Sequence, residues 1–181
     1  MNKKIMYIVT ILSTAVLLFL DQIVKYLAVL HLKGQAAIPI IKNVFELQYL
    51  ENQGAAFGIM QGKKTLFVIG TLIFLVIVVI LYHNIPLTKR FTPIRIVAVL
   101  IVAGAIGNMI DRVVHQYVID FFYFKLINFP IFNVADIYVV VACILFILLM
   151  LFYYKEEELG QIFPFMKSKN CLLYTSPSPR D

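Results

Sequence analysis

The hydrophobic positions of this chain gather into four long runs, and shorter segments rich in polar residues separate them. A helix needs about 20 mostly apolar residues to cross a lipid bilayer, and the runs are close to that length. The first run continues through Asp21 and Lys25 without a small-residue cleavage site, so we interpret it as a span and not as a removable signal peptide. The pattern predicts four membrane-spanning helices, over residues 5–30, 65–82, 94–111 and 136–154.

The segments between the spans carry two further patterns. Residues 45–49 alternate between apolar and polar side chains, which is the period of a β-strand, and the polar turn Asn52-Gln53-Gly54 follows them. The segment between the third and fourth spans is rich in Tyr and Phe, as expected at a membrane–water interface. The sequence therefore predicts an all-α membrane protein with four transmembrane helices, a small β-rich unit on the outer face and an aromatic interfacial segment.

The composition excludes a soluble globular domain. Hydrophobic residues make up 61% of the chain and charged residues 14%, and the mean hydropathy is +0.89; soluble domains average roughly 45–50% apolar and about 25% charged residues. The net charge is +6, and most of the basic residues lie in short segments between the runs. This placement is explained by the orientation of the spans in the membrane, so we predict no nucleic-acid partner. Four spans place both termini and residues 84–95 on one side, and the basic residues there predict that this side is cytoplasmic.

We expect a single integral membrane domain over residues 1–159. From Gly160 onward, Pro, Ser, Lys and Asn replace the apolar pattern, so residues 160–181 are predicted to form a disordered tail. Cys143 lies in an apolar run and Cys171 in this tail, so the two are not expected to form a disulfide. The three histidines have no mutual spacing that indicates a metal site.

Four aspartates stand beside the predicted spans, where an ionisable side chain is costly and is a candidate for function. All are expected near the outer face: Asp21, Asp111, Asp120 and Asp136. Asp111 precedes Arg112, whose charge would hold this carboxylate ionised, so we assign Asp111 a structural role. Asp120 and Asp136 have no cation close in sequence, and the apolar neighbours of Asp120 predict a raised pKa. Two such carboxyls side by side can share one proton, so that one acts as general base on water and the other as general acid on a carbonyl.

Each of these acids also has a plainer interpretation. Asn133 and Asp136 are three residues apart at the start of a predicted helix, which is the spacing of an N-cap and an acid at N3. Capping and catalysis are compatible roles. Asp120 alone would be ordinary in a hydrated loop. Asp21 and Lys25 are four residues apart, as in a common helix ion pair.

Other features leave alternatives open as well. The Asn52 amide can hold a peptide backbone, or its turn simply leads into the second span, while Gly104 and Gly107 indicate close helix packing. A transport protein with a proton path through the acids is an alternative to an enzyme, although the inner halves of the spans lack acidic residues. A structural assembly subunit would explain the spans but not the clustered acids.

Five motifs occur in order along the chain: Asp21-Gln22-Ile23-Val24-Lys25, Asn52 to Gly58, Gly104 to Arg112, Val118-Ile119-Asp120-Phe121 and Phe132-Asn133-Val134-Ala135-Asp136. Together they resemble the lipoprotein signal peptidase family, also called signal peptidase II. The resemblance implies an aspartic endopeptidase of the bacterial cytoplasmic membrane, which removes signal peptides from prolipoproteins immediately before a cysteine that bears a diacylglyceryl group. It also implies that the first outer segment forms a small β-cradle and that the active site lies at the extracytoplasmic face.

The resemblance implies roles for individual residues. The catalytic positions fall on Asp120 and Asp136. The supporting or substrate-binding positions fall on Asp21, Lys25, Asn52, Gly54, Asn108, Asp111, Arg112 and Asn133. The family implies no metal and no organic cofactor. The implied partners are prolipoproteins with a diacylglyceryl-cysteine and the membrane lipid, with no nucleic acid and no obligate protein partner. The resemblance does not cover the stretch from Gly160.

Overall fold

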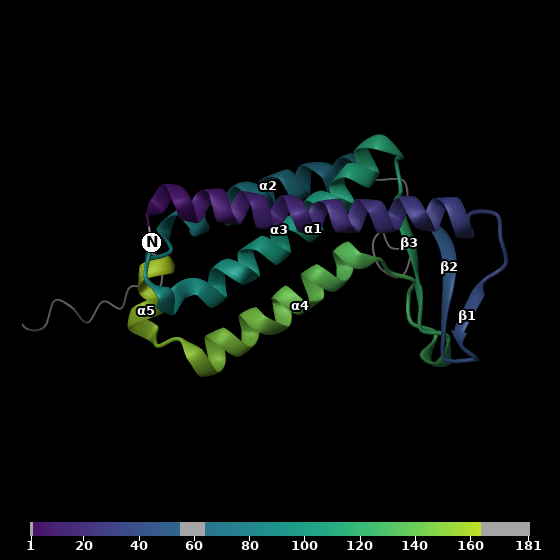
Figure 1. The fold of residues 1–181 in the computed structure, drawn as a ribbon. Coiled ribbons are helices and arrows are strands. Elements are labelled where there is room, and N and C mark those ends of the chain that lie inside the picture. Colours follow the sequence, from purple (N-terminus) through teal and green to yellow (C-terminus); the bar gives the residue numbers. More distant parts are fainter. Residues whose placement is uncertain (1, 55–63, 164–181) are drawn as a thin grey trace, which may run out of the picture.

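The structure of the protein is a computed structural model that describes residues 2–54 and 64–163. Within these ranges, four helices are long and apolar enough to cross a membrane, as predicted. They run along one another as a bundle (Figure 1). Their bounds are α1 Lys3–Leu32, α2 Lys64–Asn84, α3 Thr92–Val114, which the short turn η2 Lys89–Phe91 precedes, and α4 Val134–Leu148, which continues as the π-helical segment η4 Leu149–Tyr153.

The helices leave many of their long apolar side chains uncovered. On α1 Ile11 is 65% exposed, and on α2 Val79 is 64% exposed. Large aliphatic side chains are among those most often buried in soluble proteins. The outer surface of the bundle is therefore suited to the hydrocarbon of a bilayer, where helices satisfy their backbone polar groups internally.

A three-stranded antiparallel sheet lies across one end of the bundle (Figure 1). Its strands are β1 Ile38–Ile41, β2 Phe45–Asn52 and β3 Val118–Tyr123, in that order, and the turn η3 Lys125–Ile127 follows β3. β2 confirms the strand predicted at residues 45–49. β3 falls in the segment expected only to be aromatic and interfacial. Val118 to Phe121 are all buried, so the strand has no polar alternation by which the sequence could reveal it.

The opposite end of the bundle holds the N-terminus and a short helix, α5 Glu156–Ile162 (Figure 1). Ile162 is only 1% exposed and packs in a cluster of buried residues from α1, α2 and α3. Arg90 Nε donates to Glu158 Oε1 at 2.9 Å, which ties α5 to η2. The helix α5 therefore continues three residues past residue 159, where the sequence pattern placed the end of the domain. The rest of the expected tail, with Cys171, lies outside the described residues.

Glycines let α3 approach its neighbours closely, as predicted. A Cβ atom at Gly104 would lie 2.5 Å from the carbonyl oxygen of Ala135 in α4, and one at Gly107 would lie 2.5 Å from Asp21 Oδ2 in α1. Both separations are too short for real Cβ contacts. The two glycines thus bring three helices together directly beneath the sheet.

Replacing Gly104 by alanine is expected to destabilise the bundle, because the backbone of α4 cannot give way as a flexible side chain would. Overpacking of this kind costs about 1–3 kcal/mol. Thermal unfolding of the detergent-solubilised protein measures the effect. Gly70→Ala in α2 is the matched control, since a Cβ atom there meets nothing within 4 Å. Equal unfolding temperatures for the two variants would contradict the close approach of α3 and α4.

Candidate active site

The two aspartates expected to be catalytic meet at the sheet end of the bundle. Asp120 belongs to β3, and Asp136 lies in the first turn of α4. The chain joins these elements closely, since Phe122 N donates to Phe132 O at 2.8 Å and Phe132 N donates back to Phe122 O at 3.0 Å. This pairing brings Asn133, the residue after Phe132, against β3. Its Nδ2 donates to Asp120 Oδ1 at 2.6 Å.

Asp120 is buried and held by two amide groups. Besides Asn133, Asn52 Nδ2 at the end of β2 donates to Asp120 Oδ2 at 2.9 Å. The sheet register explains this contact, because Asn52 pairs with Val118 and is therefore a diagonal neighbour of Asp120 on the same face. Only 1% of Asp120 is exposed. Burial, followed by the nearby charge of Asp136, raises the pKa of Asp120 to about 7, which confirms the predicted direction.

Asp136 takes part in a capping box with Asn133. Asn133 Oδ1 accepts from Asp136 N at 3.0 Å, and Asn133 N donates to Asp136 Oδ2 at 3.1 Å. Asn108 Nδ2 donates to Asp136 Oδ1 at 2.8 Å. The capping interpretation is thus confirmed, and the same geometry leaves Asp136 next to Asp120. The N-terminus of a helix is a favourable position for a negative charge.

A buried cation lies behind the two aspartates. Lys25 Nζ is 3.0 Å from Asp21 Oδ2 and 2.9 Å from Asp111 Oδ2, and its side chain is 2% exposed. The predicted helix pair between Asp21 and Lys25 is therefore confirmed, but it is buried and shared with Asp111. The ion pair of Asp111 is formed with Lys25, and among the described residues the neighbouring Arg112 forms no hydrogen bond with this carboxylate. Consecutive residues on a helix point about 100° apart, and Arg112 donates its hydrogen bonds elsewhere.

The two carboxylates paired with Lys25 also hold the backbone beside the proposed catalytic residues. Asp21 Oδ1 accepts from the N–H of Ala135 at 2.9 Å, and Asp111 Oδ2 accepts from the N–H of Ile119 at 3.2 Å. Ala135 immediately precedes Asp136, and Ile119 immediately precedes Asp120. Each buried carboxylate therefore holds the peptide group that precedes one of the two aspartates, Asp136 or Asp120.

Gln22 also contacts this group of buried charges, although no role was predicted for it from the sequence. Its Nε2 lies 3.1 Å from both Asp21 Oδ2 and Asp111 Oδ1, so it donates to the two carboxylates that pair with Lys25. A polar residue between Asp21 and Ile23 in an otherwise apolar span was the available signal.

Asn108 connects the buried cation to the aspartate pair. Its Oδ1 accepts from Lys25 Nζ at 3.0 Å and from Asn133 Nδ2 at 3.1 Å. Since both of these partners are donors, the amide is fixed with its oxygen toward them. The Nδ2 group is then turned toward Asp136, where it donates at 2.8 Å.

Arg112 forms a hydrogen bond with the segment that follows β2. Its Nη2 donates to Gly54 O at 3.2 Å, and Gly54 N donates to Asn52 Oδ1 at 3.0 Å. This chain of contacts orients the Asn52 amide so that its NH2 group faces Asp120. The guanidinium also lies 4.7 Å from the ring centre of Phe67 in α2, which links α2 to α3. The rest of the motif, from Ala55 to Gly58, lies outside the described residues.

The site consists of carboxyl and amide groups around two adjacent acids. Among residues 2–54 and 64–163, no group of three or more His, Cys, Asp or Glu side chains could hold a metal ion. A carboxyl whose pKa is raised to about 7, with a second carboxyl beside it, suits general acid–base attack of water on a carbonyl.

Comparisons with known proteins identify relatives of this chain. A family described as signal peptidase (SPase) II matches residues 13–152. The lipoprotein signal peptidase of Clostridium novyi is 44% identical over 131 residues, which cover 71% of this chain and 87% of that protein. That of Streptococcus thermophilus is 41% identical over 145 residues, covering 80% and 92%. A bacterial membrane enzyme solved by the in meso method aligns with a TM-score of 0.69 and 33% identity, covering 81% of this chain and 94% of that one.

Proposed function

This chain belongs to the signal peptidase II family, and we propose that it cleaves prolipoproteins immediately before a diacylglyceryl-modified cysteine through Asp120 and Asp136. The observation that carries the proposal is the position of Asn133. Its side-chain Nδ2 donates to Asp120 Oδ1 at 2.6 Å, and its backbone N donates to Asp136 Oδ2 at 3.1 Å. One residue thus holds both carboxyls at the same end of the bundle.

The reaction uses the two carboxyls in opposite protonation states. Asp136 takes a proton from a water molecule, which attacks the carbonyl carbon of the scissile peptide bond, while Asp120 gives its proton to the carbonyl oxygen. The tetrahedral intermediate then collapses, the peptide C–N bond breaks, and the proton held by Asp136 passes to the leaving amine. Asp120 recovers its proton from the intermediate as the new carboxyl forms. No other reactant is consumed.

The arrangement of charge supports a specific orientation in the bacterial cytoplasmic membrane. Basic residues gather at the end that holds the N-terminus and α5: Lys3, Lys4, Lys89, Arg90, Arg95 and Lys155. This favours a cytoplasmic location for that end and for both chain termini. The sheet end with Asp120 and Asp136 is then extracytoplasmic. There the signal helix and lipid chains of a substrate remain in the bilayer while its scissile bond lies at the interface.

The test uses purified protein in detergent with a diacylglyceryl-modified prolipoprotein and its unlipidated counterpart. A gel shift measures removal of the signal peptide, and mass spectrometry of the product locates the new N-terminus. We expect only the lipidated substrate to be cut, with the modified cysteine as first residue of the product. Cleavage at another bond would contradict the proposed site. A folded protein that cuts neither substrate would favour the transport alternative, which a proton-flux assay in vesicles addresses.

Activity is expected to fall as pH rises through about 7, because the pKa of Asp120 is raised to about 7 and Asp120 must be protonated to donate. Below this pH Asp120 carries its proton, and above it Asp120 is charged and the general acid is lost. Initial rates with subsaturating lipidated substrate across this range measure kcat/KM and report the pKa in the free enzyme. Circular dichroism at each pH separates this loss from unfolding. A rate that stays constant or rises well above pH 7 would contradict the assigned role of Asp120.

A further inference from the structure

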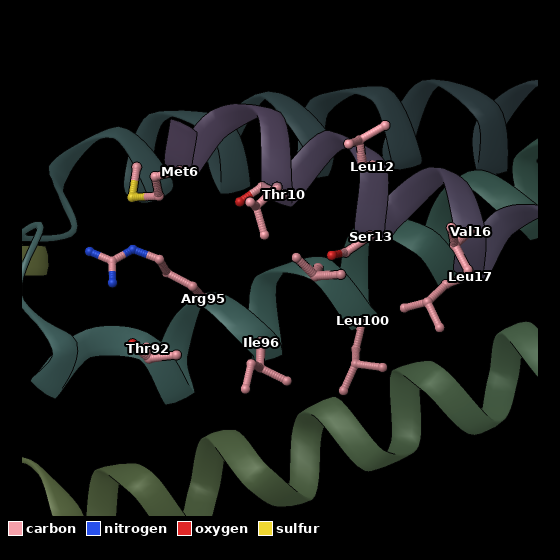
Figure 2. Close-up of a pocket in the computed structure, with 12 residues that line it drawn as sticks. Met6, Thr10, Leu12, Ser13, Val16, Leu17, Thr92, Arg95, Ile96 and Leu100 are labelled. Atoms are coloured by element: carbon pink, nitrogen blue, oxygen red, sulfur yellow. The ribbon is translucent and has the colours of Figure 1, made fainter. Parts of the chain in front are cut away.

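An apolar groove lies between α1 and α3, in the half of the bundle far from the sheet. It has a volume of about 540 Å³. Its lining includes Met6, Thr10, Ser13, Val16 and Leu17 of α1 and Arg95 of α3. Figure 2 shows Arg95 and Met6 at one end of the groove and Leu17 at the other. The groove is thus separate from Asp120 and Asp136, and nothing in the proposed reaction uses it.

The groove matches the depth of one lipid leaflet. Met6 and Leu17 are eleven residues apart in α1, which corresponds to about 17 Å at 1.5 Å per residue. Half of the hydrocarbon thickness of a bilayer is about 15 Å. Met6 and Arg95 each lie three residues inside the first residue of their helix. The groove therefore runs from the membrane surface on the N-terminal side to about the midplane.

Arg95 places a poorly compensated positive charge at the surface end of this groove. The residue is only 6% exposed, and its Nε has no hydrogen-bond partner among the described residues. Its other nitrogens donate to the backbone carbonyls of Pro86 and Thr88, which carry no net charge. In the described part of the chain, no carboxylate forms an ion pair with it. A buried guanidinium of this kind is suited to bind an anion, and phosphate matches its planar donors well.

We propose that this groove binds an anionic phospholipid of the leaflet on the N-terminal side, with one acyl chain along α1 and the phosphate at Arg95. The two ends of the groove suit the two parts of such a molecule. The end at Arg95 suits an anion, and the apolar lining beyond it suits a flexible acyl chain.

The test measures binding of phosphatidylglycerol to the purified full-length protein in detergent. Native mass spectrometry counts retained lipid, and thermal unfolding reports stabilisation by the bound molecule. Diacylglycerol with the same acyl chains and inorganic phosphate at the same concentration are the comparison ligands. We expect phosphatidylglycerol to raise the unfolding temperature and to leave one lipid bound, and neither comparison ligand to do so. Equal effects of diacylglycerol or of phosphate alone would overturn the proposal.

Two variants separate this groove from general lipid contact. Val16→Trp fills the groove at a position that is 58% exposed, and Ile11→Trp places the same side chain at a position on α1 that is 65% exposed and outside the groove. We expect at least about a tenfold loss of apparent affinity for phosphatidylglycerol in Val16→Trp and little change in Ile11→Trp. The same affinity in both variants would overturn the proposal.

Arg95→Gln tests the charge while keeping an amide that can still donate to a backbone carbonyl. It is expected to bind phosphatidylglycerol no better than diacylglycerol, because the phosphate loses its cationic partner. If this variant does not fold, the comparison of Val16→Trp with Ile11→Trp still decides the matter. Signal-peptide cleavage of a detergent-soluble substrate should be unaffected by Val16→Trp, since the groove lies at the far end from the proposed active site.

Discussion

Replacing Asp136 by asparagine is expected to lower kcat for cleavage of a lipidated prolipoprotein by about a hundredfold to ten-thousandfold, because the amide cannot take a proton from water. Loss of a general acid or base typically costs about 10²–10⁴ in rate. The substituted side chain would keep the shape of the original and one oxygen that accepts from Asn108 or from Asn133 N. Binding of substrate should change much less than kcat, so the loss should appear mainly in the turnover rate.

Asp120→Asn is expected to have an equally large effect, because the carbonyl oxygen of the substrate loses its proton donor. Each variant is measured by gel shift with the lipidated substrate, after confirming that the protein is present in the membrane fraction and unfolds cooperatively. Glu51→Gln makes the same chemical change on β2, where Glu51 pairs with the exposed Lys33, and should retain full activity. Full activity in either aspartate variant would remove that residue from the mechanism.

Replacing Lys25 by methionine should destabilise the protein by about 3–5 kcal/mol, since removing one partner of a buried ion pair leaves uncompensated charge. The charge left behind comes from Asp21 and Asp111, both less than 2% exposed. Cleavage should also fall, because these carboxylates hold the peptide groups before Asp136 and Asp120. Thermal and denaturant unfolding in detergent measure stability, and the gel shift measures cleavage.

Lys33→Met is the matched control for this prediction. Lys33 also forms an ion pair, at 2.7 Å from Glu51 Oε1, but half of its side chain is exposed. Exposed pairs contribute little to stability, so no measurable change in unfolding is expected. Adding Asp111→Asn to Lys25→Met should recover part of the lost stability, because one uncompensated charge is removed. A Lys25→Met protein as stable as Lys33→Met would show that the buried pair does not hold the site together.

Local patterns predicted the parts of this molecule that depend on local chemistry. The apolar runs predicted the four spans, since a bilayer demands about 20 apolar residues whatever the tertiary fold. The spacing of Asn133 and Asp136 predicted a helix cap, because capping involves residues within one turn. Asp120 has apolar neighbours and no cation close in sequence, which predicted a raised pKa. Burial raises the pKa of this carboxyl in the structure.

Long-range contacts were the part that the sequence could not supply. Lys25 of α1 compensates Asp111 of α3, far along the chain, and the neighbouring Arg112 instead donates to Gly54 and Asn108. The strand β3 was missed because both of its faces are covered, and the alternation that identifies a half-exposed strand is then absent. The acids were identified individually, but the amide groups of Asn52, Asn108 and Asn133 acquire their partners only through the fold.

Asn133 has two structural roles, and together they restrict which residues can replace it. The same side chain caps α4 and contacts Asp120, so a substitution there is selected against both as a folding defect and as a defect of the proposed active site. A change that relieved one defect would not relieve the other, because the carbonyl oxygen serves the cap and the amide nitrogen serves the carboxyl. Only a side chain with both an acceptor and a donor at these positions satisfies the two demands. Drift at this residue should therefore be slower than at an equally buried residue that only fills space.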